Sequence, residues 1–164
     1  MSVVNVVIKD RQLVADAWSW LQSPGETLPH PGAGLILPWA GWLGTGAALA
    51  AKGYRVGVWL GPETALADLE AHWPALAALP LIAVHFPAFT DGRGYSLARD
   101  LRRLGYGGEL RAVGQVLRDQ LLFLEQCGFD AFALAPGQDP EAALAGFSAY
   151  SHRPGLRRRA AEPV

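Results

Sequence analysis

The chain has 164 residues, a formal net charge of −1, 51% hydrophobic residues and 18% charged residues. This length suits a single domain, and the apolar composition excludes a chain that is disordered throughout. The near-zero net charge argues against a nucleic-acid partner, because phosphate binding requires a sustained basic surface.

Cysteine content restricts the chemistry further. Cys127 is the only cysteine, so the chain can form no internal disulfide and cannot alone supply an all-cysteine zinc or iron–sulfur site. We therefore expect no metal site. Cys127 stands just before Gly128 at the end of a predicted helix, which favours a buried small hydrophobe over a reactive thiolate. Because neither a signal peptide nor a membrane span is evident, we expect a cytoplasmic protein without a membrane partner.

The predicted elements fall into three regions. Residues 1–32 begin with a β-branched run and a turn and continue into a loop rich in proline and glycine, so they predict an N-terminal extension of hairpin and loop. Residues 33–150 alternate apolar strands with helical segments, with strands expected at 35–37, 54–60, 80–86, 109–116 and 129–134. Residues 151–164 predict a basic, flexible tail.

The alternation of strands and helices predicts the fold class. Nearly continuous apolar strands such as 54–60 are typical of parallel strands covered on both faces. We expect an α/β domain with a mainly parallel sheet of about five strands and flanking helices, either flavodoxin-like or a half-barrel of βα units.

The turn that follows strand 80–86 is the first candidate binding element. It reads Thr-Asp-Gly-Arg-Gly-Tyr-Ser over residues 90–96 and leads into a helix. Glycines and a helix N-terminus bring backbone N–H donors to a ligand, and an arginine can pair bidentately with an oxyanion. The pattern therefore predicts an anion site formed by Arg93, Gly94, Tyr95 and Ser96. In the alternative interpretation, Asp91 caps the helix and pairs with Arg93.

A second group of polar residues follows along the chain. Arg111 lies inside a predicted strand, where an arginine is costly unless paired. It is either half of a buried ion pair, with Glu109, Asp91 or Asp119 as partner, or a residue that faces a ligand. The first turn of the next helix carries Arg118, Asp119 and Gln120, and Asp119 there suits the helix dipole as well as it suits catalysis.

Other polar side chains in this region have simpler interpretations. His85, near the end of strand 80–86, is expected to be a satisfied and partly buried histidine. The charged residues of the helix after residue 96 fall away from a leucine stripe formed by Leu97, Leu101 and Leu104, and we expect them to form a solvated face. They are Arg99, Asp100, Arg102 and Arg103.

The region from residue 86 to residue 132 resembles a bacterial domain-of-unknown-function family, DUF934, whose members are described as oxidoreductases of sulfite reduction. The family pattern is FPxFxDGRGYSxARxLR, then GYxGELRAxGxVLRDQ, then RCGFDAF. It is met here by residues 86–89, 91–96, 98–99, 101–102, 105–112, 114, 116–120 and 127–132. Gln115 stands where an aspartate is expected and Gln126 where an arginine is expected.

The resemblance implies an accessory protein of assimilatory sulfite reduction in cysteine biosynthesis, which either binds a small oxyanion or contacts sulfite reductase. It names no cofactor, and the sequence lacks a complete glycine fingerprint for one. The hypothetical site has Asp91 and Asp119 as candidate catalytic carboxylates. Its candidate anion-binding residues are Arg93, Gly94, Tyr95, Ser96, Arg111, Arg118 and Gln120.

Two alternatives remain open at this point. One is an enzyme that acts on a phosphorylated or sulfonated small molecule, with Arg93 and Arg111 clamping the anion and Asp119 as acid or base. The other is an interaction module without small-molecule chemistry, which would use an exposed tryptophan patch in the N-terminal half. Its candidate residues are Trp18, Trp20, Trp39 and Trp42.

Overall fold

The computed structural model describes residues 5–23 and 26–148, so the predicted basic tail lies outside the described residues. It contains one sheet with the strand order β2-β1-β8-β7-β6-β5-β4-β3. Strands β3 to β8 run parallel in sequence order, and β1 and β2 are antiparallel to their neighbours. The strands are β1 (Val6–Lys9), β2 (Gln12–Ala15), β3 (Trp18–Trp20), β4 (Gly34–Pro38), β5 (Arg55–Leu60), β6 (Leu81–Phe86), β7 (Glu109–Gly114) and β8 (Ala131–Phe132).

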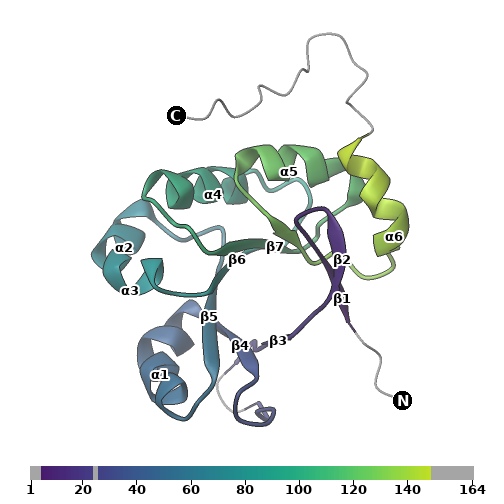
Figure 1. Ribbon diagram of the computed structural model, residues 1–164. Helices are drawn as coiled ribbons and strands as arrows, with labels where there is room; N and C mark the ends of the chain where they lie inside the picture. The colour runs from purple at the N-terminus through teal and green to yellow at the C-terminus, as the bar shows by residue number, and fades with distance from the viewer. Residues whose placement is uncertain (1–4, 24–25, 149–164) are drawn as a thin grey trace.

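The helices all lie on the outer side of the curled sheet (Figure 1). Parallel strands that follow one another in a constant direction, with crossovers of one hand, place every helix on the same face. None of the described helices is both long and apolar enough to cross a bilayer. The helical segments are α1 (Trp39–Ala51), α2 (Leu66–Ala71), α3 (Trp73–Ala77), α4 (Arg93–Arg103), η1 (Arg118–Gln120), α5 (Leu121–Cys127), α6 (Pro140–Ala143) and η2 (Leu144–Phe147).

The α/β class is confirmed, and the sheet is the half-barrel version of the predicted fold. It has eight strands where about five were expected. The difference comes from the predicted N-terminal extension, because β1 pairs with β8 at one side of the sheet and β3 pairs with β4 at the other. A strand of three residues such as β3 is too short to show an alternating pattern in the sequence.

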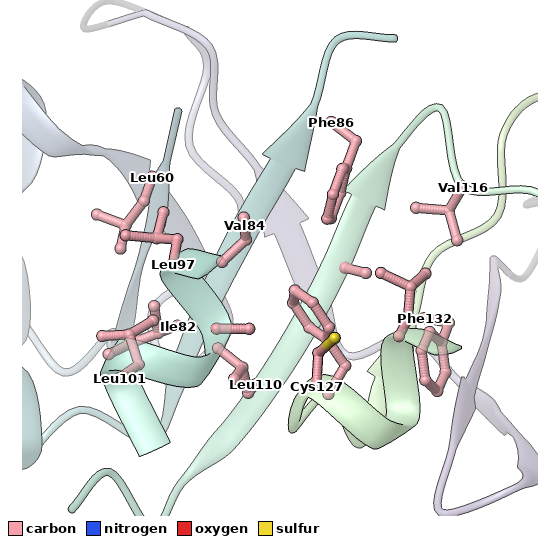
Figure 2. Packing of buried hydrophobic residues seen from close by; sticks show 14 of the residues in the cluster. Leu60, Ile82, Val84, Phe86, Leu97, Leu101, Leu110, Val116, Cys127 and Phe132 are labelled. Atoms are coloured by element: carbon pink, nitrogen blue, oxygen red, sulfur yellow. The ribbon is translucent and has the colours of Figure 1, made fainter. Parts of the chain in front are cut away.

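The largest core cluster lies between the sheet and the helices. Figure 2 shows Leu97 and Leu101 of α4 lying over Ile82 and Val84 of β6. Leu101, Ile82 and Val84 are fully buried, as expected for the stripe that the sequence predicted. Strand residues of opposite parity point to the concave face, where Ile36, Leu81, Ala83 and Val113 form a smaller cluster with Trp18, Trp20 and Trp59.

A short link joins the two edges of the sheet. Strand β2 ends at Ala15 and β3 begins at Trp18, at the opposite edge, so only Asp16 and Ala17 connect them. Three consecutive Cα–Cα steps span at most about 11 Å. The two edges of the sheet therefore approach each other where β2 ends and β3 begins.

Arg102 of α4 ties two connecting segments together, the one between α4 and β7 and the one between α5 and β8. Its Nε donates to the Gly128 carbonyl at 2.9 Å, and its Nη1 donates to the carbonyls of Tyr106 at 2.8 Å and Gly108 at 3.0 Å. The sequence predicted a solvated side chain, and that prediction was wrong for Arg102. The long apolar stem crosses the helix surface while the guanidinium reaches carbonyls beyond the end of α4, a behaviour that helical spacing does not reveal.

Asp130 makes the stability of the fold depend on pH. Its carboxylate accepts a hydrogen bond from the Leu110 N–H at 2.8 Å. Burial raises its pKa above the ordinary 3.8, although the Leu110 hydrogen bond and Arg102 act in the opposite direction. A carboxyl with a raised pKa stabilises the fold below its unfolded pKa, and this contribution is lost as pH rises through the folded pKa.

We therefore expect Asp130→Asn to flatten the decline in stability as the pH rises from 3.8 towards neutrality. Thermal unfolding across this range measures the effect, with Asp119→Asn as an exposed control. An unchanged pH profile in Asp130→Asn would contradict the expectation.

Candidate functional site

The predicted site residues lie in or just after the loops that follow β6 and β7, at the carboxyl ends of the strands where parallel α/β sheets place their ligands, except for Arg111, which lies within β7. Residues 87–92 follow β6 and lead into α4, and residues 115–117 follow β7 and lead into η1. The glycine at the end of β7, Gly114, has a φ of +93°. A side chain there would meet the Phe86 carbonyl and the His85 ring, so the two strand ends approach each other closely.

Arg93 is paired within its own turn. Its Nε lies 3.0 Å from Asp91 Oδ1 and its Nη2 lies 2.8 Å from Asp91 Oδ2, a bidentate ion pair. The Arg93 backbone N–H also donates to Asp91 Oδ1 at 3.1 Å. These hydrogen bonds from Arg93 hold the pKa of Asp91 below its ordinary value. The ion pair matches the alternative interpretation of the turn, in which Asp91 pairs with the arginine, whereas the N-cap position of α4 is Gly92 and not Asp91.

Gly94, Tyr95 and Ser96 belong to the first turns of α4. Gly94 is buried, and a Cβ there would meet the Phe86 ring, so this glycine permits close packing of helix on strand. The Tyr95 ring packs between Phe86 and Phe123, with centroid distances of 5.4 and 5.0 Å. Ser96 is exposed on the outer side.

Gln120 joins the two loops. Its Oε1 accepts from the Leu117 N–H at 3.0 Å. Its Nε2 donates to the Phe89 carbonyl at 2.8 Å and to the Tyr95 hydroxyl at 3.2 Å. The structure therefore brings Gln120 and Tyr95 together, as members of a support for the loop after β6.

That support carries two exposed aromatic rings. Phe89 is 55% exposed and Phe123 is 48% exposed. The guanidinium carbon of Arg99 lies 5.9 Å from the centre of the Phe123 ring. We call Phe89, Tyr95 and Phe123 the aromatic platform. The sequence held one signal for it, since Phe123 is an apolar residue that falls off the inward stripe of Leu121 and Leu124.

Arg118 and Asp119 lie on η1 and are exposed. Within the described part of the chain, neither side chain makes an ion pair. They directly precede Gln120, whose side chain contacts Phe89 and Tyr95 of the platform. They remain available to a partner that approaches the platform.

Arg111 lies on the other face of the sheet. It is 3% exposed, with Nη2 at 2.9 Å from Glu109 Oε2 and Nη1 at 3.0 Å from Asp16 Oδ1. Lys9 Nζ completes the cluster at 3.1 Å from Glu109 Oε1. Pairing with Glu109 was one expected alternative, whereas Asp16, which is distant in sequence, was not foreseen. Arg93 begins α4 on the convex side, so the two arginines do not share a site.

The fold and this edge define an α/β half-barrel protein that presents an aromatic platform at the carboxyl ends of its parallel strands. The chain belongs to DUF934, a family of bacterial proteins of unknown function, whose family model matches residues 57–164. The match begins within β5 and includes all the predicted site residues, while β1 to β4 precede it. No curated protein matches the chain.

Proposed function

We propose that this protein is an accessory protein of assimilatory sulfite reduction and that it acts by contacting sulfite reductase. The link to sulfite reduction comes from the resemblance of residues 86–132 to the family pattern. The observation that carries the mode of action is the aromatic platform. Among the described residues, Phe89 is the most exposed large hydrophobic residue at 55%, followed by Leu43 at 49% and Phe123 at 48%.

The platform has the physical properties of a protein contact. Exposed phenylalanines at a defined edge lose unfavourable contact with water when a partner covers them. The backbone of Phe89 is held by Gln120, and the Phe123 ring is packed on Tyr95. Little conformational entropy is therefore lost on binding, which favours affinity.

The arginines support contact with a protein over tight binding of an oxyanion. The bidentate edge of Arg93 is occupied by Asp91, and Arg111 is held by Asp16 and Glu109. An oxyanion at either guanidinium would have to displace a carboxylate already in place. A protein partner that covers the exposed rings of Phe89 and Phe123 does not have to displace a carboxylate.

Co-elution of the protein with assimilatory sulfite reductase on size exclusion, followed by calorimetry, tests this function. We expect Phe89→Ala with Phe123→Ala to weaken binding about a hundredfold, since loss of an aromatic anchor commonly costs about tenfold or more. Leu43→Ala is the matched control, because Leu43 is an exposed residue of α1 that is distant in sequence from Phe89 and Phe123. Undiminished binding by the double variant would remove the platform from the proposal, and absence of binding by the wild type would remove the proposal itself.

A further inference from the structure

A cavity lies on the concave face, apart from the aromatic platform. Its volume is about 280 Å³. It is lined in part by Val113 and Gly114 of β7 and by Ala133 and Leu134, which follow β8, and we call it the cup. The cup is lined by residues that include Asp16, Trp18, Trp20, His85, Arg111 and Val113.

Aromatic rings form one wall of the cup. Trp20 stacks on Trp59 with a centroid distance of 4.9 Å and an interplanar angle of 21°. The His85 ring lies 5.9 Å from Trp20 and 5.6 Å from Trp59. Its other side is bounded by Gly114, where a Cβ would meet the imidazole. The ring is therefore held in place by packing, and it presents a fixed edge.

His85 supplies a polar group without a protein partner. Within the described residues its imidazole makes ring contacts but no hydrogen bond, and no side-chain nitrogen there is both buried and unpartnered. Its ring nitrogens are thus reachable from solvent. Burial lowers the pKa of His85 below its ordinary 6.5, against a smaller opposite effect of Glu63, so the neutral ring predominates at pH 7. A neutral imidazole offers one donor and one acceptor.

The ion-pair cluster that contains the cup residues Asp16 and Arg111 carries no net charge. Arg111 and Lys9 contribute two positive charges, and Asp16 and Glu109 contribute two negative charges, joined by contacts of 2.9 to 3.1 Å. A charged ligand would lose hydration in the cup and find no uncompensated counter-charge. Tryptophan faces and aliphatic side chains instead favour a flat, apolar ring.

We infer that the cup binds a small, uncharged, planar heteroaromatic molecule, which packs against the tryptophan wall and hydrogen-bonds to His85. The site is independent of the partner contact at the aromatic platform. Trp18 and Trp20 precede the part of the chain that the family model matches.

Nicotinamide and nicotinate are suitable probes because they share a ring and differ in charge. In calorimetric and tryptophan-fluorescence titrations of the full chain, we expect saturable binding of nicotinamide and at least about tenfold weaker binding of nicotinate. His85→Phe keeps an aromatic ring and removes both nitrogens, so it should weaken nicotinamide binding about tenfold. His72→Phe is the control, since His72 lies outside the cup.

Three results would overturn the inference. They are no saturable signal with nicotinamide, equal or tighter binding of nicotinate, and unchanged nicotinamide binding in His85→Phe. Circular dichroism and the melting temperature of each variant show whether it is folded. If His85→Phe does not fold, Val113→Phe, which places a ring at the cup wall, should block nicotinamide binding by occupying the cavity.

Discussion

Replacing Arg111 with methionine is expected to lower the free energy of unfolding by about 3–5 kcal/mol, the usual cost of breaking a buried ion pair. Arg111 is 3% exposed and bridges Asp16 and Glu109. Without the guanidinium, the largely buried carboxylates of Asp16 and Glu109 would lose the cation between them. The link between β2 and β3 would also lose its tie to β7.

Chemical denaturation at neutral pH measures this loss. The triple variant Arg111→Met, Asp16→Asn and Glu109→Gln is the informative control, because removing all the charges of a buried network together is often nearly neutral. We expect the triple variant to recover most of the stability that the single variant loses. A loss below about 1 kcal/mol in Arg111→Met would show that the cluster behaves as an exposed one.

Replacing Arg102 with methionine is expected to cost about 2–3 kcal/mol. Methionine keeps most of the apolar stem but removes the donors to the carbonyls of Gly128, Tyr106 and Gly108. Hydrogen bonds from a charged group contribute about 1.5–3 kcal/mol each, and water replaces part of them where the site is half-exposed.

Arg103 provides a matched control on the same helix. Its side chain is 76% exposed and lies 3.4 Å from Asp100 in a surface ion pair. Arg103→Met should change the free energy of unfolding by no more than about 0.5 kcal/mol. Equal effects of the two substitutions in urea denaturation would contradict the structural role of Arg102.

The predictable part of the fold followed from burial. Strands β4, β5 and β6 are covered on both faces and read as apolar runs, so the sequence predicted them closely. Strand β3 was missed because its three residues, Trp18 to Trp20, are held by pairing with β4, a contact that no local pattern encodes. The curl of the sheet depends on how all the crossovers combine. The sequence therefore predicted the half-barrel only as one of two alternatives, beside a flavodoxin-like fold.

The candidate site was predictable where the contacts are local. The pairing of Asp91 with Arg93 and that of Glu109 with Arg111 each join residues two positions apart, and both were among the expected alternatives. The contact of Asp16 with Arg111 spans 95 positions, and it depends on the link that brings the sheet edges together. The reach of Arg102 and the position of His85 in the cup likewise depend on tertiary packing.

We propose that this half-barrel protein works through the aromatic platform and not through an arginine site for oxyanions. Parallel calorimetric titrations of the same protein, one with assimilatory sulfite reductase and one with sulfite, test it most directly. We expect saturable heat with the reductase, lost in the variant with Phe89→Ala and Phe123→Ala, and no saturable heat with sulfite. Saturable sulfite binding that Arg93→Ala abolishes, without binding to the reductase, would contradict the claim.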